Sequence, residues 1–250
     1  MTSLFKTQLA QGKQLIGTIL CLPAPELAEI CVDAGIDWLF IDMEHGTLEI
    51  IDVQRILKAV GGKIPCLVRV PTNDEMWIKK VLDTGADGLI IPHVNSADDA
   101  RRAVQTSKYP PDGTRSVGIG RAHRYGAQFQ EYLDRANDDI AVVVQAEHID
   151  AVKNIESILA VKGIDAVLIG PYDLSASMNK PGQVTDPEVQ SAIARVKQVC
   201  ATTGIPISIF AGNLETGKQA LQDGYNFVAV HTDVGLISGM YSQLVKTLRG

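Results

Sequence analysis

Short, nearly continuous apolar runs alternate along the chain with stretches of helical spacing. The apolar runs cover residues 15–21, 38–43, 65–70, 88–94, 140–146, 166–170, 205–210 and 227–231. They are rich in β-branched residues and do not alternate with polar ones, as expected of parallel strands that are covered on both faces. The pattern therefore predicts eight buried parallel strands.

The stretches between these runs mostly show helical spacing, and most end in glycine, which is common just beyond the C-terminus of a helix. Predicted helices cover residues 25–35, 48–62, 73–87, 96–109, 151–163, 186–204 and 214–224, with a last helix at 234–248. This alternation favours a (β/α)8 TIM barrel over a doubly wound sheet. Residues 3–12 are predicted as an additional N-terminal helix that caps the bottom of the barrel.

Composition narrows the class of protein. The 250 residues are 46% hydrophobic and 21% charged, which is enough for a full core, and we expect one domain over residues 1–250. The net charge of -6 comes without a basic block, which argues against nucleic-acid binding and for small-molecule ligands. No apolar run reaches the roughly 18 residues of a membrane span, so we expect no membrane segment.

The four cysteines, Cys21, Cys31, Cys66 and Cys200, lie far apart and form no C-x-x-C pair. They are typical of buried free thiols, and the expected location is the cytoplasm. Neither G-x-G-x-x-G nor G-x-x-x-x-G-K-[ST] follows a predicted strand, which disfavours redox and kinase functions. The irregular segment 109–128 carries four Arg or His side chains and four glycines, and is predicted to be a lid or an exposed insertion.

Polar side chains follow many of the predicted strands. In a TIM barrel the active site lies at the C-terminal ends of the strands, so these residues are the candidates. Glu147 and Asp173 follow two adjacent strands, and both carboxylates can converge on one hard divalent cation such as Mg²⁺ or Mn²⁺. The alternative is that each acid stabilises the N-terminus of a helix.

Arg69 ends a buried strand, where its guanidinium needs either an anionic ligand or a salt bridge to a neighbouring strand-end acid. His45 can act as a general base, or it is simply exposed in its loop. Gln145 shares the strand face of Glu147, whereas His148 should point away from the site. His93 and His231 are candidates for polar lining only.

These residues lie in motifs that resemble the HpcH/HpaI family of metal-dependent, class II pyruvate aldolases. The resemblance covers nearly the whole chain. It rests on WLFIDMEHG, CLVRV, LIIPHV, YPPDGTRSVG, VVVQAEH, VLIGPYDLSASM and FVAVHTD, in family order and spacing. Enzymes of this family cleave 4-hydroxy-2-oxo acids to pyruvate and an aldehyde, for example 4-hydroxy-2-oxoheptanedioate or a 2-keto-3-deoxy sugar acid.

The resemblance implies roles for individual residues. Glu147 and Asp173 would hold Mg²⁺, Mn²⁺ or Co²⁺, while Gln145 and the backbone at Tyr172 and Asp173 would contact the pyruvate half. His45 would be the base, and Arg69 would stabilise the oxyanion. Asp83 aligns with an acid that pairs with the catalytic histidine. Its place late in the predicted helix 73–87 is the wrong end of the barrel for such a pair within one subunit, unless a neighbouring chain supplies it.

Two departures from the family pattern bear on specificity. Tyr172 replaces a residue that is often small, and His123 and Arg124 fall in the segment 109–128, where they would favour an acidic tail on the aldehyde half. The resemblance also implies a homo-oligomer, with dimers that build hexamers and a terminal helix exchanged between subunits. Two other functions stay open: an acyl-CoA hydroxy-acid lyase of the same pyruvate and phosphoenolpyruvate barrel group, and a non-catalytic barrel that binds a 2-oxo acid.

Overall fold

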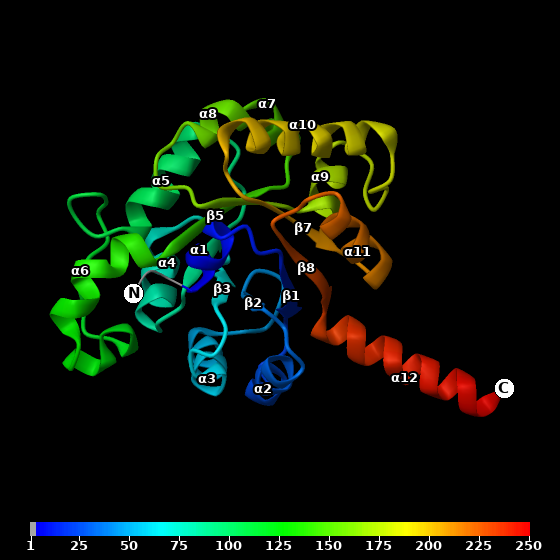
Figure 1. Cartoon of the computed structure of the whole chain (residues 1–250), viewed down its shortest axis with the longest axis horizontal. Coiled ribbons are helices and arrows are strands. Elements are labelled where there is room, and N and C mark those ends of the chain that lie inside the picture. The colour runs from blue at the N-terminus through cyan, green and yellow to red at the C-terminus, as the bar shows by residue number, and fades with distance from the viewer. Residues whose placement is uncertain (1–3) are drawn as a thin grey trace.

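The eight strands close into a parallel barrel in the computed structural model, which describes residues 4–250 (Figure 1). The strands are β1 (Leu15–Leu20), β2 (Trp38–Asp42), β3 (Cys66–Arg69), β4 (Gly88–Ile91), β5 (Ala141–Ala146), β6 (Ala166–Ile169), β7 (Ile207–Ala211) and β8 (Phe227–Thr232). Neighbours pair in sequence order, and β8 returns to β1. The predicted (β/α)8 barrel is confirmed.

Helices follow the strands on the outside of the barrel. They are α1 (Leu4–Ala10), α2 (Pro25–Asp33), α3 (Ile50–Val60), α4 (Glu75–Asp83), α5 (Ala97–Ser107), the 3₁₀ helix η1 (Arg121–Gly126), α6 (Phe129–Asp139), α7 (Ile149–Lys153), α8 (Ile155–Leu159), α9 (Pro171–Ser177), α10 (Pro187–Thr203), α11 (Leu214–Gln222) and α12 (Asp233–Arg249). Residue 3 of the predicted N-terminal helix lies outside the described residues.

The barrel interior is filled by side chains of alternate strand positions. Phe5 of α1 packs edge-on against Phe227 at 5.2 Å between ring centroids, and lies 6.1 Å from Trp38. Trp38 and Phe40 point inward on β2, and the same alternation brings Asp42, two residues further on, to the inner side at the strand end. A packed interior therefore leaves only the strand ends for a ligand.

A repeated polar contact fixes the strands at the opposite end of the barrel. Before β2, β4, β6 and β8 an Asp or Asn side chain accepts a hydrogen bond from the first backbone N–H groups of the preceding strand. The pairs are Asp37 with Ile16 at 3.0 Å, and Asp87 with Cys66, Asp165 with Val142 and Asn226 with Ile207, each at 2.8 Å. A glycine with positive φ precedes each of these four residues by two positions, where the chain turns from helix to strand.

The structure differs from the predicted elements between β4 and β5, between β5 and β6, and after β6. Helix α6 was not predicted; its Ala136 is buried, and Tyr132 and Leu133 are partly buried against the core. The predicted helix 151–163 is divided at Asn154, which separates α7 from α8. The motif IGPYDLSASM continues beyond β6 into the short helix α9, which begins at Pro171. Proline favours the first turn of a helix because its missing N–H would have no partner there.

Helix α12 extends away from the barrel (Figure 1). Its first residue, Asp233, is buried and accepts hydrogen bonds from the backbone N–H groups of Cys21 and Leu22, which ties the start of the helix to the end of β1. Beyond this anchor its large apolar side chains are exposed. Among residues 4–250, no helix is long and apolar enough to cross a membrane.

Candidate active site

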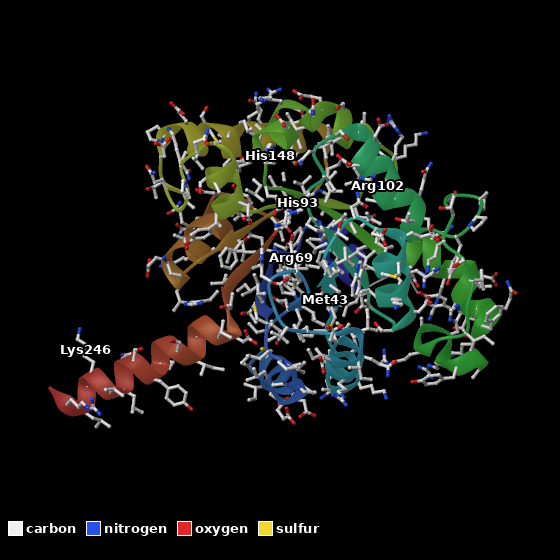
Figure 2. The ribbon with its side chains drawn as sticks, turned by 180° about the vertical axis from the view of Figure 1, so that it is seen from behind. Met43, Arg69, His93, Arg102, His148 and Lys246 are labelled. Carbon is white, nitrogen blue, oxygen red and sulfur yellow. The ribbon has the colours of Figure 1, made fainter. Side chains whose placement is uncertain are left out.

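A cavity of about 300 Å³ opens at the C-terminal ends of the strands. Figure 2 shows Arg69 and His93 near the centre of the barrel, with His148 further toward its edge. The predicted site residues that line the cavity are His45, Arg69, Gln145, Tyr172 and Asp173, together with Asp42, Cys21 and Phe210. The strand ends therefore bring five predicted residues to one space.

Asp42 and Arg69 form a buried ion pair on one wall of this cavity. They are register partners on β2 and β3. Nε and Nη2 of Arg69 donate to the two carboxylate oxygens of Asp42 at 2.9 and 2.7 Å, and Nη1 lies 3.1 Å from Oε2 of Glu44. The salt bridge considered from the sequence is thus present, and Arg69 also faces the cavity. The hydrogen bonds and charge of Asp42 raise the pKa of Arg69 against the effect of burial, so it stays cationic.

Glu147 is, like Asp42, an almost completely buried acid, with 2% of its surface exposed. Its Oε1 accepts a 2.7 Å hydrogen bond from the backbone N–H of His93, and its Oε2 accepts one from the amide of Gln145. Burial raises the pKa of Glu147 to about 7; the hydrogen bond from His93 opposes this, and the charge of Glu44 adds to it. A buried carboxylate of this kind needs a nearby cation to hold its charge.

Glu44 and His93 lie beside this carboxylate. Nδ1 of His93 is 3.3 Å from Glu147 Oε1, and Nε2 is 3.3 Å from Glu44 Oε1. Glu44, His93 and Glu147 each offer a ligand atom, and these atoms lie within 4.8 Å of one another. The sequence indicated His93 only as polar lining, because the bend that follows β4 and turns this side chain toward β5 has no sequence signal of its own.

The donors present suit a divalent cation. Two carboxylates and an imidazole converge, and the buried Oε1 of Gln145 accepts no hydrogen bond from the described residues. Oxygen-rich sets of this kind bind Mg²⁺ or Mn²⁺, and an imidazole extends the range to Co²⁺ and similar ions. The residues therefore fit the metal dependence for which this family of aldolases is known.

Asp173 and Tyr172 lie in the first turn of α9, on the other side of the cavity. Asp173 is exposed, and its charge is near enough to raise the pKa of Glu147. Gly170 permits this approach, because a Cβ at that position would lie 3.0 Å from the Gln145 amide nitrogen and 3.1 Å from Cβ of Glu147. The Tyr172 side chain is 46% exposed, and its ring centroid lies 6.0 Å from that of Phe210.

The alternation predicted for β5 places its polar residues as expected. Gln145 and Glu147 are both buried on the inner side. His148 lies at the N-terminus of α7, where its Nδ1 accepts a hydrogen bond from the N–H of Asp150 at 3.1 Å. His148 therefore has a structural contact outside the cavity. His45 is exposed, with its Nε2 3.8 Å from Glu44 Oε2.

Asp83 does not line the cavity of its own chain. It is the last residue of α4, and its Oδ1 accepts a 2.7 Å hydrogen bond from Nη2 of Arg115. Arg115 is fully buried, stacks on Tyr109 at 4.5 Å and donates to the Tyr132 hydroxyl. Asp83 and His45 are thus not brought together within one subunit, and their pairing stays a prediction that requires a neighbouring chain.

The segment 109–128 is anchored by the same cluster. His123 is completely buried and stacks on Phe129, with Tyr132 edge-on at 4.5 Å. Burial lowers the pKa of His123, so it is neutral near pH 7. Arg124 lines a separate cavity beneath α6. Neither His123 nor Arg124 lines the cavity of its own chain, and the ring of His123 completes an aromatic core, so the structure gives no support to their predicted contact with an acidic aldehyde half.

Cys21 is a lining residue that the sequence did not single out. Burial, together with the charges of Asp42 and Asp233, raises the pKa of its thiol to about 12, so it is not a nucleophile at neutral pH. Cys21 follows directly after β1 and reaches the cavity because β1 lies between β8 and β2 in the barrel. All four cysteines are free; Cys66 and Cys200 are buried, and Cys21 and Cys31 are partly buried.

The parallel (β/α)8 barrel with charged side chains at its strand ends is the architecture of TIM-barrel enzymes. In this protein the strand ends also carry donors for a divalent ion. A family model described as HpcH/HpaI aldolase/citrate lyase matches residues 16–239. The chain belongs to this family, as its motifs indicated, and is an aldolase of the class II type.

Named relatives agree with this assignment. The chain is 40% identical to a 4-hydroxy-2-oxovalerate aldolase of Rhodococcus jostii, over 96% of this chain and 93% of the relative. It is 40% identical to a 4-hydroxy-2-oxo-heptane-1,7-dioate aldolase of Escherichia coli, over 95% and 92%. The crystal structure of an HpcH/HpaI aldolase/citrate lyase family protein from Burkholderia cenocepacia is similar with a TM-score of 0.96 and 34% identity, and each chain is covered completely.

Proposed function

We propose that this protein cleaves a 4-hydroxy-2-oxo acid reversibly to pyruvate and an aldehyde. The observation that supports this most directly is one small cavity lined by the cationic Arg69 and by Gln145, whose amide donates to the buried carboxylate of Glu147 behind it. Such a site can bind the 2-oxo acid through a divalent cation on one side. On the other side, Arg69 can stabilise the alkoxide that develops on the C4 oxygen. The alternative, a lyase that acts on the acyl-CoA ester of a hydroxy acid, would need space for a much larger substrate than the cavity of about 300 Å³ offers.

Glu147 and Asp173 would hold the divalent ion, which supplies a Lewis acid for the keto oxygen of the substrate when it is bound. Gln145 offers its unpartnered amide oxygen, or after rotation its NH₂ group, to the pyruvate half. The backbone N–H groups of Tyr172 and Asp173 lie in the first turn of α9, where such groups have no partner within the helix, and would receive the substrate carboxylate.

His45 would take the proton of the C4 hydroxyl. The C4–O bond then becomes the carbonyl of the aldehyde, and the electron pair of the C3–C4 bond passes to the pyruvate half. Return of the proton to C3 gives pyruvate, so no other reactant is consumed. Arg69 would stabilise the negative charge that develops on the C4 oxygen, an effect that is worth about 3 kcal/mol in comparable sites.

Substrates with short chains are the first to test. The relatives named for 4-hydroxy-2-oxovalerate and 4-hydroxy-2-oxo-heptane-1,7-dioate differ in the length and charge of the aldehyde half. Pyruvate release should be measured for both acids with Mg²⁺, Mn²⁺ and Co²⁺, before and after EDTA. We expect release that EDTA abolishes and that added metal restores; release that persists after chelation would contradict the metal-dependent reaction. Binding of the acids without turnover would instead favour a binding protein.

We also propose that the active form is a homo-oligomer in which α12 packs on a second copy. The helix exposes Leu236, Met240, Tyr241, Leu244 and Leu248 beyond its anchor at Asp233. In addition, Ile16 on the outer side of β1 is 42% exposed, where parallel barrel strands are normally covered by a helix. A partner's α12 has the apolar side chains to cover this wall.

The four free thiols support a reducing, cytoplasmic location.

A further inference from the structure

His93 has an unusual backbone for its position. Its φ is 54°, in the left-handed region that few residues other than glycine adopt, although asparagine, aspartate and histidine do so more often than the rest. This conformation directs its N–H to Oε1 of Glu147 at 2.7 Å and at the same time brings its ring over the same carboxylate. The backbone and the side chain of one residue thus both reach the buried carboxylate of Glu147.

The ring nitrogens face two different acids. Nδ1 lies 3.3 Å from Glu147 Oε1, and Nε2 lies 3.3 Å from Glu44 Oε1. Two ligand atoms that each lie about 2.1 Å from one ion are separated by about 3 to 3.5 Å at octahedral or tetrahedral angles. The separation of 3.3 Å between Nδ1 and Oε1 of Glu147 therefore lies in the range that a shared ion permits.

We propose that His93 is a ligand of the cation that Glu147 holds, through Nδ1, and that Glu44 accepts the proton on Nε2. A carboxylate that accepts from the second nitrogen of a ligating histidine fixes its tautomer and ring orientation, and strengthens it as a ligand. This inference rests on the proposed metal site, and adds a nitrogen to a donor set that otherwise contains only oxygen.

A nitrogen ligand changes which ion is preferred. Imidazole binds Co²⁺, Ni²⁺ and Zn²⁺ more strongly, whereas carboxylate and water ligands suit Mg²⁺. The protein should therefore favour Co²⁺ over Mg²⁺ by a larger factor than an all-oxygen site would. The ratio of Co²⁺ to Mg²⁺ affinity should fall when the imidazole of His93 is removed and the rest of the protein is unchanged.

The test uses the whole protein loaded with Mn²⁺ and pulsed electron paramagnetic resonance, which detects a ¹⁴N nucleus bound to the ion. His93→Asn is the variant, because asparagine tolerates positive φ and can keep the N–H to Glu147. His231→Asn is the matched control: His231 also has positive φ, at 61°, at the end of β8, and its Nδ1 accepts from the N–H of Thr232. Calorimetric titration with Co²⁺ and Mg²⁺ gives a second measurement.

We expect a ¹⁴N signal in the unaltered protein and in His231→Asn, and its loss in His93→Asn together with a fall of about tenfold or more in the Co²⁺ to Mg²⁺ affinity ratio. A signal that persists in His93→Asn, or that is absent from Mn²⁺-loaded unaltered protein, would overturn the inference and leave the proposed metal site intact. Glu147→Gln separates the two: if Mn²⁺ binds equally well to this variant, the proposed site itself is wrong.

Discussion

Arg69 and Asp42 join the ends of β3 and β2 through two hydrogen bonds, from Nε and Nη2 of the guanidinium to the two carboxylate oxygens. Oδ1 of Asp42, which accepts from Nε of Arg69, also accepts hydrogen bonds from the backbone N–H of Glu44 at 3.0 Å and of His45 at 3.4 Å. The buried carboxylate of Asp42 therefore positions both the guanidinium of Arg69 and the loop that carries His45, the candidate base.

Asp42→Ala should destabilise the protein by about 3–5 kcal/mol, because it leaves the Arg69 charge buried without its partner. It should also lower turnover, since the loop of His45 loses its acceptor. Denaturant unfolding gives the first quantity and pyruvate release the second. The control is Asp98→Ala, whose partner Arg101 is exposed; that pair should contribute no more than about 1 kcal/mol. Equal losses in both variants would contradict the importance of the buried pair.

His45→Gln should lower kcat by about 10²- to 10⁴-fold, the range typical of losing a general base, with Mn²⁺ binding unchanged. His148→Gln is the matched control, since His148 contacts Asp150 at the start of α7 and lies outside the cavity. Steady-state kinetics and metal titration of both variants provide the measurements. If His45→Gln retained full turnover, another group would have to accept the hydroxyl proton.

Asp87 provides a prediction for the pH dependence of stability. Burial raises the pKa of Asp87 to about 6, although hydrogen bonds from the backbone and the charge of Arg121 oppose this. The native state therefore binds more protons than the unfolded state between about pH 4 and pH 6, where the unfolded carboxyl is already ionised. The contribution of Asp87 to stability falls as the pH rises through this window, by at most about 3 kcal/mol.

Asp87→Asn should keep the hydrogen bond to Cys66 but remove the buried charge; Asn226 makes the equivalent contact with Ile207 through an amide. The variant should therefore gain stability relative to the unaltered protein as the pH increases from 4 to 7. Urea unfolding at a series of pH values measures this difference, with the exposed Asp98→Asn as a control. A difference that stays constant over the range would show that the carboxyl is ionised throughout it.

Helix α12 provides a prediction for assembly. Met240→Glu with Leu244→Glu should dissociate the oligomer, because two charges would be buried against a partner. Ser242→Glu adds a charge about 200° around the helix from Leu244 and should leave the mass unchanged. Sedimentation velocity measures the mass of each variant. An unaltered protein that sediments as a monomer would rule out the exchanged helix.

The sequence by itself determined the barrel and the polar side chains that gather at its strand ends. Apolar runs, helical spacing and glycines at positive φ are local, since each reflects burial or backbone freedom within a few residues. Alternation along β5 was also enough to separate Gln145 and Glu147 from His148, because successive strand residues point to opposite faces. Helix α6 was missed, although Tyr132 and Leu133 on it pack against the core beside the buried Ala136.

Only the tertiary structure decided which side chains meet across strands. The left-handed backbone at His93 brings its ring to Glu147 and Glu44, and the fork of Arg69 with Asp42 depends on the register of β2 and β3. Packing likewise directs His123 into an aromatic core and Asp83 to Arg115. These contacts join residues that are distant along the chain, so their geometry depends on strand order, register and loop path, which no local pattern encodes.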